Sequence, residues 1–150
     1  MSKTLWDEAA RRTLLERARR LSPESRPQWG SFTVDRMLAH VVDGFRMATG
    51  ELAVRPKKVR LPIGRWPLNV LFIHLVGMPK HAPTARELIA RPPAPLAEEL
   101  RALDAQMALL ASMHERTDWP AHPVFGKLSR RAWGVLGYKH LDHHLRQFGV

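Results

Sequence analysis

The chain has 150 residues, of which 45% are hydrophobic and 25% are charged. This balance is typical of one globular domain with a buried core and argues against a disordered chain. The sequence contains no cysteine, which excludes disulfides, thiolate metal ligands and a nucleophilic thiol carried by the protein itself. We expect a single domain over residues 1–150. Because neither disulfides nor a signal peptide are predicted, we also expect a cytoplasmic protein.

The formal net charge of +10 raises the question of a nucleic-acid or membrane partner. The basic residues, however, are scattered from Arg11 to Arg146, without the interleaved aromatic residues that a base-stacking surface requires. The most apolar stretch, residues 67–78, is too short to span a bilayer and contains His74. We therefore expect no membrane segment, and the sequence disfavours nucleic acid as a partner.

Two amphipathic helices are predicted in the first third of the chain. Apolar residues at helical spacing predict a helix over residues 4–21, which Pro23 ends. A second apolar stripe predicts a helix over residues 33–49, with Thr33 as the N-cap and Gly50 ending the helix.

Proline dominates the middle of the chain. Eight of the twelve prolines lie between residues 56 and 95, so this stretch cannot form one long element. We expect an irregular crossover with one short apolar helix at residues 68–76. The segment from Trp66 to Met78 is a candidate for a lid over a site or for a dimer contact.

Two more helices are predicted after the prolines. From Leu96 to His114 the apolar positions repeat at intervals of four and three, which predicts a long core-facing helix. Ser129 is the expected N-cap of a final helix that runs to about Gln147. Four amphipathic helices without paired strands predict an all-α four-helix bundle with a long Pro-rich crossover between its second and third helices.

The final helix carries three histidines within five residues. His140 and His144 are four residues apart and share one helix face, where two imidazoles can bind a single metal ion. His143 lies nearer the edge of that face. A basic helix end produces the same pattern, since the helix dipole favours histidine there. The residues alone leave both interpretations open.

The second predicted helix supplies a third candidate ligand, His40. Asp43 follows three residues later and could orient an imidazole or pair with an arginine. Gly44 and Gly137 would leave open space beside the histidines of the two helices. Leu141 stands where the glutamate of an H-E-x-x-H zinc site would be, so the general base of that mechanism is absent.

The sequence resembles the DinB-like superfamily. The resemblance rests on a histidine early in the second helix and on the pattern H-x-x-x-H-x-x-Q in the last, here His40, His140, His144 and Gln147. The phrases GSFTVDRMLAH, HPVFGKLS and GYKHLDHHLRQFG are similar to a subgroup of that superfamily known only as a domain of unknown function. The resemblance extends from about residue 21 to residue 150.

This resemblance implies a four-helix bundle, often dimeric, in which three histidines hold a divalent metal, either zinc or nickel. The implied ligands are His40, His140 and His144. One coordination position would stay open for water or substrate, as in catalytic rather than structural metal sites. Gln147 belongs to the same terminal motif and is a candidate pocket residue.

Other polar residues have no fixed place in the implied ligand set. His143 is either a surface residue or an alternate ligand. His122 could reach the mouth of the site or could be a loop histidine packed against Phe125. Lys139 and Arg146, if they lie near the mouth of the site, could attract carboxylates of a small thiol bound there, or they could simply be solvated. The remaining histidines are expected to be structural or solvated: His74, His81 and His114.

Three functions stay open from the sequence. Relatives implied by the resemblance include transferases and isomerases that use small thiols, so the leading hypothesis is a metal-dependent enzyme that activates a thiol or water, of transferase or hydrolase type. Because the chain lacks cysteine, the thiol would be a low-molecular-weight co-substrate. The second hypothesis is a stress-associated binding protein whose metal is structural or vestigial, with Asp43 closing a four-ligand sphere. The third is a nucleic-acid-binding protein, suggested by charge alone.

Overall fold

The computed structural model describes residues 3–57, 67–76, 78–80 and 84–150, and this part of the chain is all-helical, without a strand. Trp66 and His81 lie outside the described residues. The elements in chain order are α1 (Glu8–Ala18), α2 (Val34–Thr49), α3 (Leu68–Leu75), the 3₁₀ helix η1 (Arg86–Ile89), α4 (Leu96–Ser112) and α5 (Arg130–Gln147).

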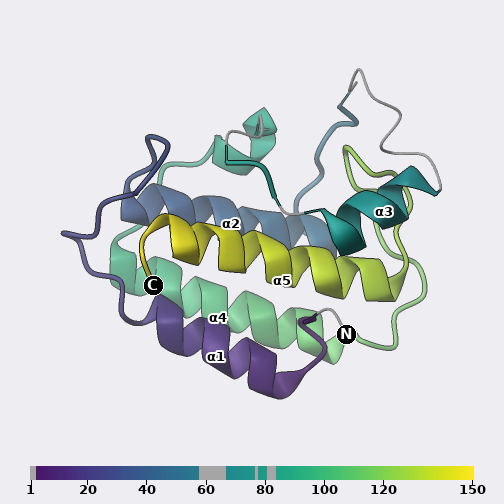
Figure 1. Ribbon diagram of the computed structural model, residues 1–150, viewed down its shortest axis with the longest axis horizontal. Helices are drawn as coiled ribbons and strands as arrows, with labels where there is room; N and C mark the ends of the chain where they lie inside the picture. Colours follow the sequence, from purple (N-terminus) through teal and green to yellow (C-terminus); the bar gives the residue numbers. More distant parts are fainter. Residues whose placement is uncertain (1–2, 58–66, 77, 81–83) are drawn as a thin grey trace.

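The long helices α1, α2, α4 and α5 form a bundle. Both α1 and α2 pack against α4 and α5, so each of these helices has two neighbours in the bundle. Figure 1 shows α2 and α5 side by side, with α3 lying across one end of α5. The predicted all-α bundle is confirmed, and the connection from α2 to α4 carries α3 and η1.

Burial of apolar stripes holds the bundle together. The stripes predicted from helical spacing face one core, whose fully buried side chains include Leu14, Met37, Leu38, Val41, Phe45, Leu103, Met107, Leu110, Leu141 and Leu145. A smaller cluster joins α3 to α5 and contains Ile73, Ala132, Val135 and Leu136. No helix in the described ranges is long and apolar enough to cross a membrane.

Two predicted helices are shorter in the structure. The first was expected from residue 4, but the Asp7 carboxylate accepts a hydrogen bond from the Ala9 N–H and begins α1 at Glu8. Leu5 is instead bonded through its N–H to the Gly134 carbonyl of α5. The helix expected to reach His114 ends at Ser112, and the exposed His114 imidazole pairs with the neighbouring Glu115.

The predicted helix ends agree better elsewhere. Thr33 occupies the N-cap position of α2, although its side chain makes no capping hydrogen bond. Gly50 ends α2 with φ of 94°, a left-handed conformation that glycine adopts without strain. The Ser129 side chain accepts a hydrogen bond from the Ala132 N–H and caps α5 as predicted.

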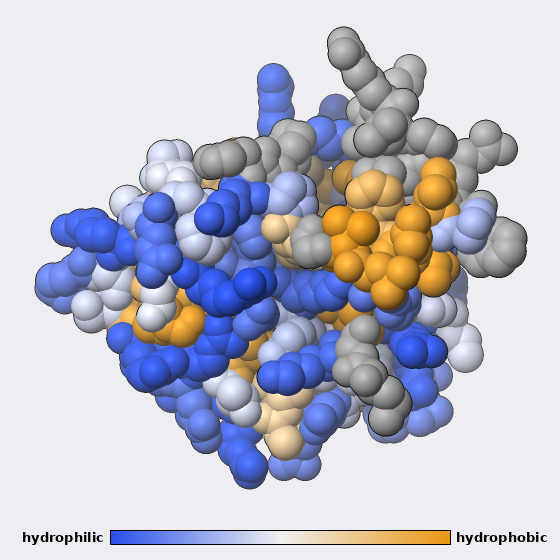
Figure 2. Space-filling view, in the orientation of Figure 1, coloured by the Kyte–Doolittle hydropathy of each residue, from blue (hydrophilic) through white to orange (hydrophobic). Residues whose placement is uncertain are grey.

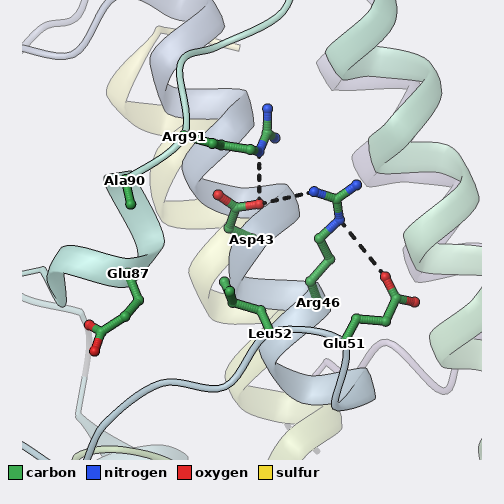
Figure 3. A pocket seen from close by; sticks show the side chains of 7 residues that line it. All are labelled: Asp43, Arg46, Glu51, Leu52, Glu87, Ala90 and Arg91. Carbon is green, nitrogen blue, oxygen red and sulfur yellow. Dashed lines mark hydrogen bonds and ion pairs between the residues drawn. The ribbon is translucent and has the colours of Figure 1, made fainter.

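A buried ion cluster fastens the end of the crossover to the bundle (Figure 3). The Arg91 guanidinium donates two hydrogen bonds to Glu99 of α4, at 2.6 and 2.8 Å, and its Nε donates to Asp43 of α2 at 2.9 Å. The carboxylate side chains are only 1% and 4% exposed. Arg46 makes a longer contact of 3.5 Å with Asp43.

The charges in this cluster stabilise one another. Burial raises the pKa of Glu99, but the hydrogen bonds from Arg91 outweigh it and hold that pKa below its ordinary value. The hydrogen bonds to Glu99 raise the pKa of Arg91. Desolvation opposes this shift, and the hydrogen bond to Asp43 adds to it. Arg36 of α2 adds hydrogen bonds to the carbonyls of Ile89 and Arg91. Together these bonds fix η1 against α2.

Replacing Arg91 with leucine should cost about 3–5 kcal/mol of unfolding free energy, because the buried carboxylates of Glu99 and Asp43 both lose their closest cation. The matched control is Arg19→Leu, since Arg19 pairs with Asp104 at an exposed site and its loss should cost less than about 1 kcal/mol. Urea denaturation of both variants measures the difference. Equal losses would show that the cluster around Arg91 does not stabilise the fold as described.

Candidate metal centre

Three histidines from two helices converge inside the bundle. His40 comes from α2, and His140 and His144 come from successive turns of α5. Their ring centroids lie 4.8 to 5.0 Å apart, and each ring can offer a nitrogen within 4.8 Å of the other two. The structure therefore brings together the three residues that the sequence motif singled out, in an arrangement that could hold a metal ion.

The protonated nitrogen of His40 is set by a backbone carbonyl. Its Nδ1 lies 3.2 Å from the carbonyl oxygen of Leu88 in η1. Because a carbonyl oxygen only accepts, Nδ1 must carry the proton and donate. The Nε2 atom is then unprotonated and directs its lone pair into the histidine cluster.

A chain of hydrogen bonds sets the ring of His144 in the same way. The side-chain amide of Gln147 donates from Nε2 to the Trp29 carbonyl at 2.7 Å. This orientation leaves the Gln147 Oε1 to accept from the His144 Nδ1 at 2.8 Å. The Nε2 of His144 is therefore also unprotonated. Hydrogen bonds of this kind orient imidazole ligands in metal sites.

The position of the third ring, that of His140, fits a shared metal ion. The Nε2 atoms of His140 and His40 lie 2.9 Å apart. Two lone pairs do not face each other at that distance without a proton or a cation between them. In tetrahedral zinc sites, Zn–N bonds of 2.0–2.1 Å place ligand nitrogens about 3.3 Å apart, close to this separation. The donor set and the spacing both fit a divalent ion.

Burial keeps these imidazoles neutral at physiological pH. It is the main cause that lowers the pKa of all three, to about 3 for His144, with the neighbouring imidazoles adding to the effect at His140 and His144. For His40, the Leu88 carbonyl and Asp43 oppose the shift only in part. A neutral imidazole is the form that coordinates metal, so no proton has to be removed first.

Asp43 is not directed at an imidazole. Of the two roles that the sequence left open, the structure shows the pairing with arginine, since the carboxylate contacts Arg91 and Arg46. Figure 3 shows Asp43 between these two arginines, in a pocket separate from the histidine cluster. Backbone and amide carbonyls orient His40 and His144 instead.

His143 is neither a surface residue nor a member of the three-histidine group. Its side chain is buried, with its ring 5.6 Å from that of Trp29 and 5.2 Å from that of His144. Of the two alternatives for His143, the surface position is wrong, because the side chain is buried against Trp29. The ring lines the cavity described below.

The two glycines beside the histidines permit close packing. A Cβ on Gly44 would lie 3.1 Å from Cε1 of His140, so this glycine lets that ring approach α2. A Cβ on Gly137 would lie 2.6 Å from a methyl group of Leu5. Both glycines also line the cavity beside the cluster, so the expected open space is present next to this close packing.

His122 lies in the loop before α5 and shapes that loop. Its Nδ1 accepts hydrogen bonds from the N–H groups of Val124 and Phe125, at 3.1 and 3.2 Å. Its ring packs against Phe125 and Trp133. It also lines the same cavity as the histidine cluster. Burial lowers the pKa of His122 to about 4.

A cavity of about 740 Å³ opens beside the cluster. All three clustered histidines line it, and the half-buried His140 is the most accessible of them. Lys139 lines this cavity, whereas Arg146 does not and pairs with Asp142 on the outer surface. Of the two basic residues predicted at the mouth, only Lys139 lies there.

Sequence reasoning missed the groups that orient the cluster. The carbonyls of Leu88 and Trp29 come from irregular segments, and a carbonyl leaves no residue-type signal. Arg91 was also missed, because a single arginine within a proline-rich segment carries no distinctive spacing. Gln147 was named from the motif, and its amide contacts His144.

Comparison with known proteins gives one match. The model of the DinB superfamily matches residues 7–148, which extends the similarity through α1, beyond the range that the motifs suggested. No curated protein and no solved structure matches the chain.

The buried His122 should make the metal-free protein less stable in acid. Its pKa is about 4 when folded and about 6.5 when unfolded, so the unfolded chain takes up the proton first as pH falls. From pH 7 to pH 5 this difference removes about 2 kcal/mol of stability. His122→Asn keeps a hydrogen-bond acceptor that does not titrate. Urea denaturation at pH 7 and pH 5 should show that the variant loses about 2 kcal/mol less stability between these pH values than the original protein does. An equal loss in both proteins would contradict the assignment.

Proposed function

The chain belongs to the DinB superfamily, and on that premise we propose that it is a metal-dependent enzyme whose divalent ion, zinc or nickel, is bound by His40, His140 and His144. The enzyme would activate a small thiol or a water molecule as the nucleophile, and it would be a transferase or a hydrolase. The observation that carries the proposal is the convergence of three neutral imidazoles. In two of them Nδ1 donates a hydrogen bond to a carbonyl oxygen, which leaves Nε2 unprotonated.

An open coordination position supports a catalytic rather than a structural site. Structural zinc sites are closed by four protein ligands, whereas catalytic sites keep one position for water or substrate. Among the described residues, the metal-binding group contains three histidines and no carboxylate, and Asp43 is held by arginines. The cavity that all three histidines line would give water or substrate access to an ion held there.

The bound ion would supply an activated nucleophile by lowering the pKa of a coordinating thiol or water. The protein would orient the three imidazoles, exclude bulk water and shape the cavity. His122 would serve as a hydrogen-bond donor rather than a base, because its Nδ1 accepts two backbone N–H groups and its remaining proton is on Nε2. The thiol must come from a co-substrate, since the chain has no cysteine.

Metal content tests the proposal directly. Protein purified without a chelator or affinity tag should hold close to one zinc or nickel ion per chain by elemental analysis. His40→Ala, His140→Ala and His144→Ala should each lose most of it, because two imidazoles seldom retain what three hold.

The matched control is His114→Ala, since His114 is an exposed histidine outside the cluster. It should keep the metal content of the original protein. Retention of metal in all three cluster variants, or equal loss in the His114 variant, would reject the site.

A further inference from the structure

The cavity beside the histidine cluster is lined by basic side chains. Its described lining includes three lysines and no aspartate or glutamate: Lys57, Lys80 and Lys139. The histidines that line it are neutral or weakly basic and supply no negative charge. A divalent ion on three neutral imidazoles would add two further positive charges. Positive charge at the cavity therefore favours an anionic ligand, and Lys139 is the cation on which the argument below depends.

Lys139 is the best placed of these cations. It stands beside His140 on α5, one helical turn from His143, and all three side chains line the cavity. Its ammonium donates to the Val76 carbonyl at 3.1 Å, which accounts for one of its three protons. The Lys139 side chain is half-buried in this position. A partly desolvated ammonium of this kind gains from a bound anion.

Lys80 supplies a second cation to the cavity lining. The Lys80 ammonium stands 4.7 Å above the ring of Trp29, which packs against His143. The sequence shows the same excess of positive charge around Lys80. Residues 52–86 contain seven basic residues and no acidic one: Arg55, Lys57, Lys58, Arg60, Arg65, Lys80 and Arg86. The connection from α2 to α4 therefore favours approach of an anion.

Apart from these cations the cavity wall is largely apolar. Side chains of α3 and of the loop before α5 contribute Phe72, Ile73, Val76, Val124 and Phe125. The volume of about 740 Å³ is within the range of small-molecule sites. Figure 2 shows the apolar surface of α3 that continues outward from this wall, where Val70, Leu71 and Leu75 are exposed. A wholly polar ligand would leave this wall in contact with water.

We propose that the cavity binds an amphiphilic anion, a carboxylate with an aliphatic or aromatic body, which packs that body on the α3 side while Lys139 pairs with the carboxylate. If the proposed function is correct, this anion is the substrate of the metal site, and only that part of the inference rests on the proposed function. Binding itself uses cavity groups that are present without metal.

Calorimetric titration of the metal-free protein with three ten-carbon probes tests the inference. Decanoate should bind at least about tenfold more tightly than decanol or decylammonium, because only the carboxylate gains from the lysines. Lys139→Gln should weaken decanoate binding about five- to tenfold and leave decanol binding unchanged. Lys139→Arg should restore decanoate binding. Unchanged decanol binding also shows that the variant cavity is intact.

Two controls separate the cavity from the surface. Lys127→Gln removes the same charge from an exposed loop residue outside the lining, and Leu75→Ser removes an exposed apolar side chain of α3 outside it. Neither should alter decanoate affinity. Equal binding of the three probes, or equal effects of the Lys139 and Lys127 variants, would overturn the inference.

Separate outcomes reject the metal site and the anion site. Protein stripped of its metal with a chelator should still bind decanoate more tightly than decanol, although it holds no ion. Absence of decanoate binding in a protein that holds zinc would reject the anion site and leave the metal site standing. Decanoate binding in a protein that takes up no metal would reject the proposed function and leave the anion site standing.

Discussion

The arrangement of the candidate site depends on the ion cluster formed by Arg91, Glu99 and Asp43. These charges join the end of the crossover to α2 and α4 in a place that water hardly reaches, so their interactions are strong and removal of one partner is costly. The segment they hold includes η1, whose Leu88 carbonyl sets the protonated nitrogen of His40. A cluster some distance from the histidines thus determines which nitrogen faces the site.

Burial then gives the histidines their chemical character. Desolvation lowers the pKa of His40, His140 and His144, while carbonyl acceptors fix the orientation of two of the rings. The result is a set of unprotonated nitrogens beside a cavity without described carboxylates. Such a set favours a cation among the imidazoles, and the cation in turn favours an anionic ligand in the cavity.

Periodicity predicted the fold because helical stripes and helix caps are local. The stripes of the long helices, the cap at Ser129 and the end at Gly50 all follow from neighbouring residues. The motif likewise named the three histidines that converge. Asp43 could not be assigned, because its partner Arg91 is 48 residues away. The roles of Leu88 and Trp29 lie in backbone carbonyls of irregular segments, which no residue pattern reveals.

The central claim is that one ion lies among the three Nε2 atoms, with its fourth position open to the cavity. An anomalous-difference map from crystals grown with zinc or nickel, recorded at the absorption edge of the metal, tests this most directly. The account predicts a single strong peak about 2.0–2.1 Å from Nε2 of His40, His140 and His144. A peak coordinated by His143 or Asp43, or no peak in crystals that contain the metal, would contradict it.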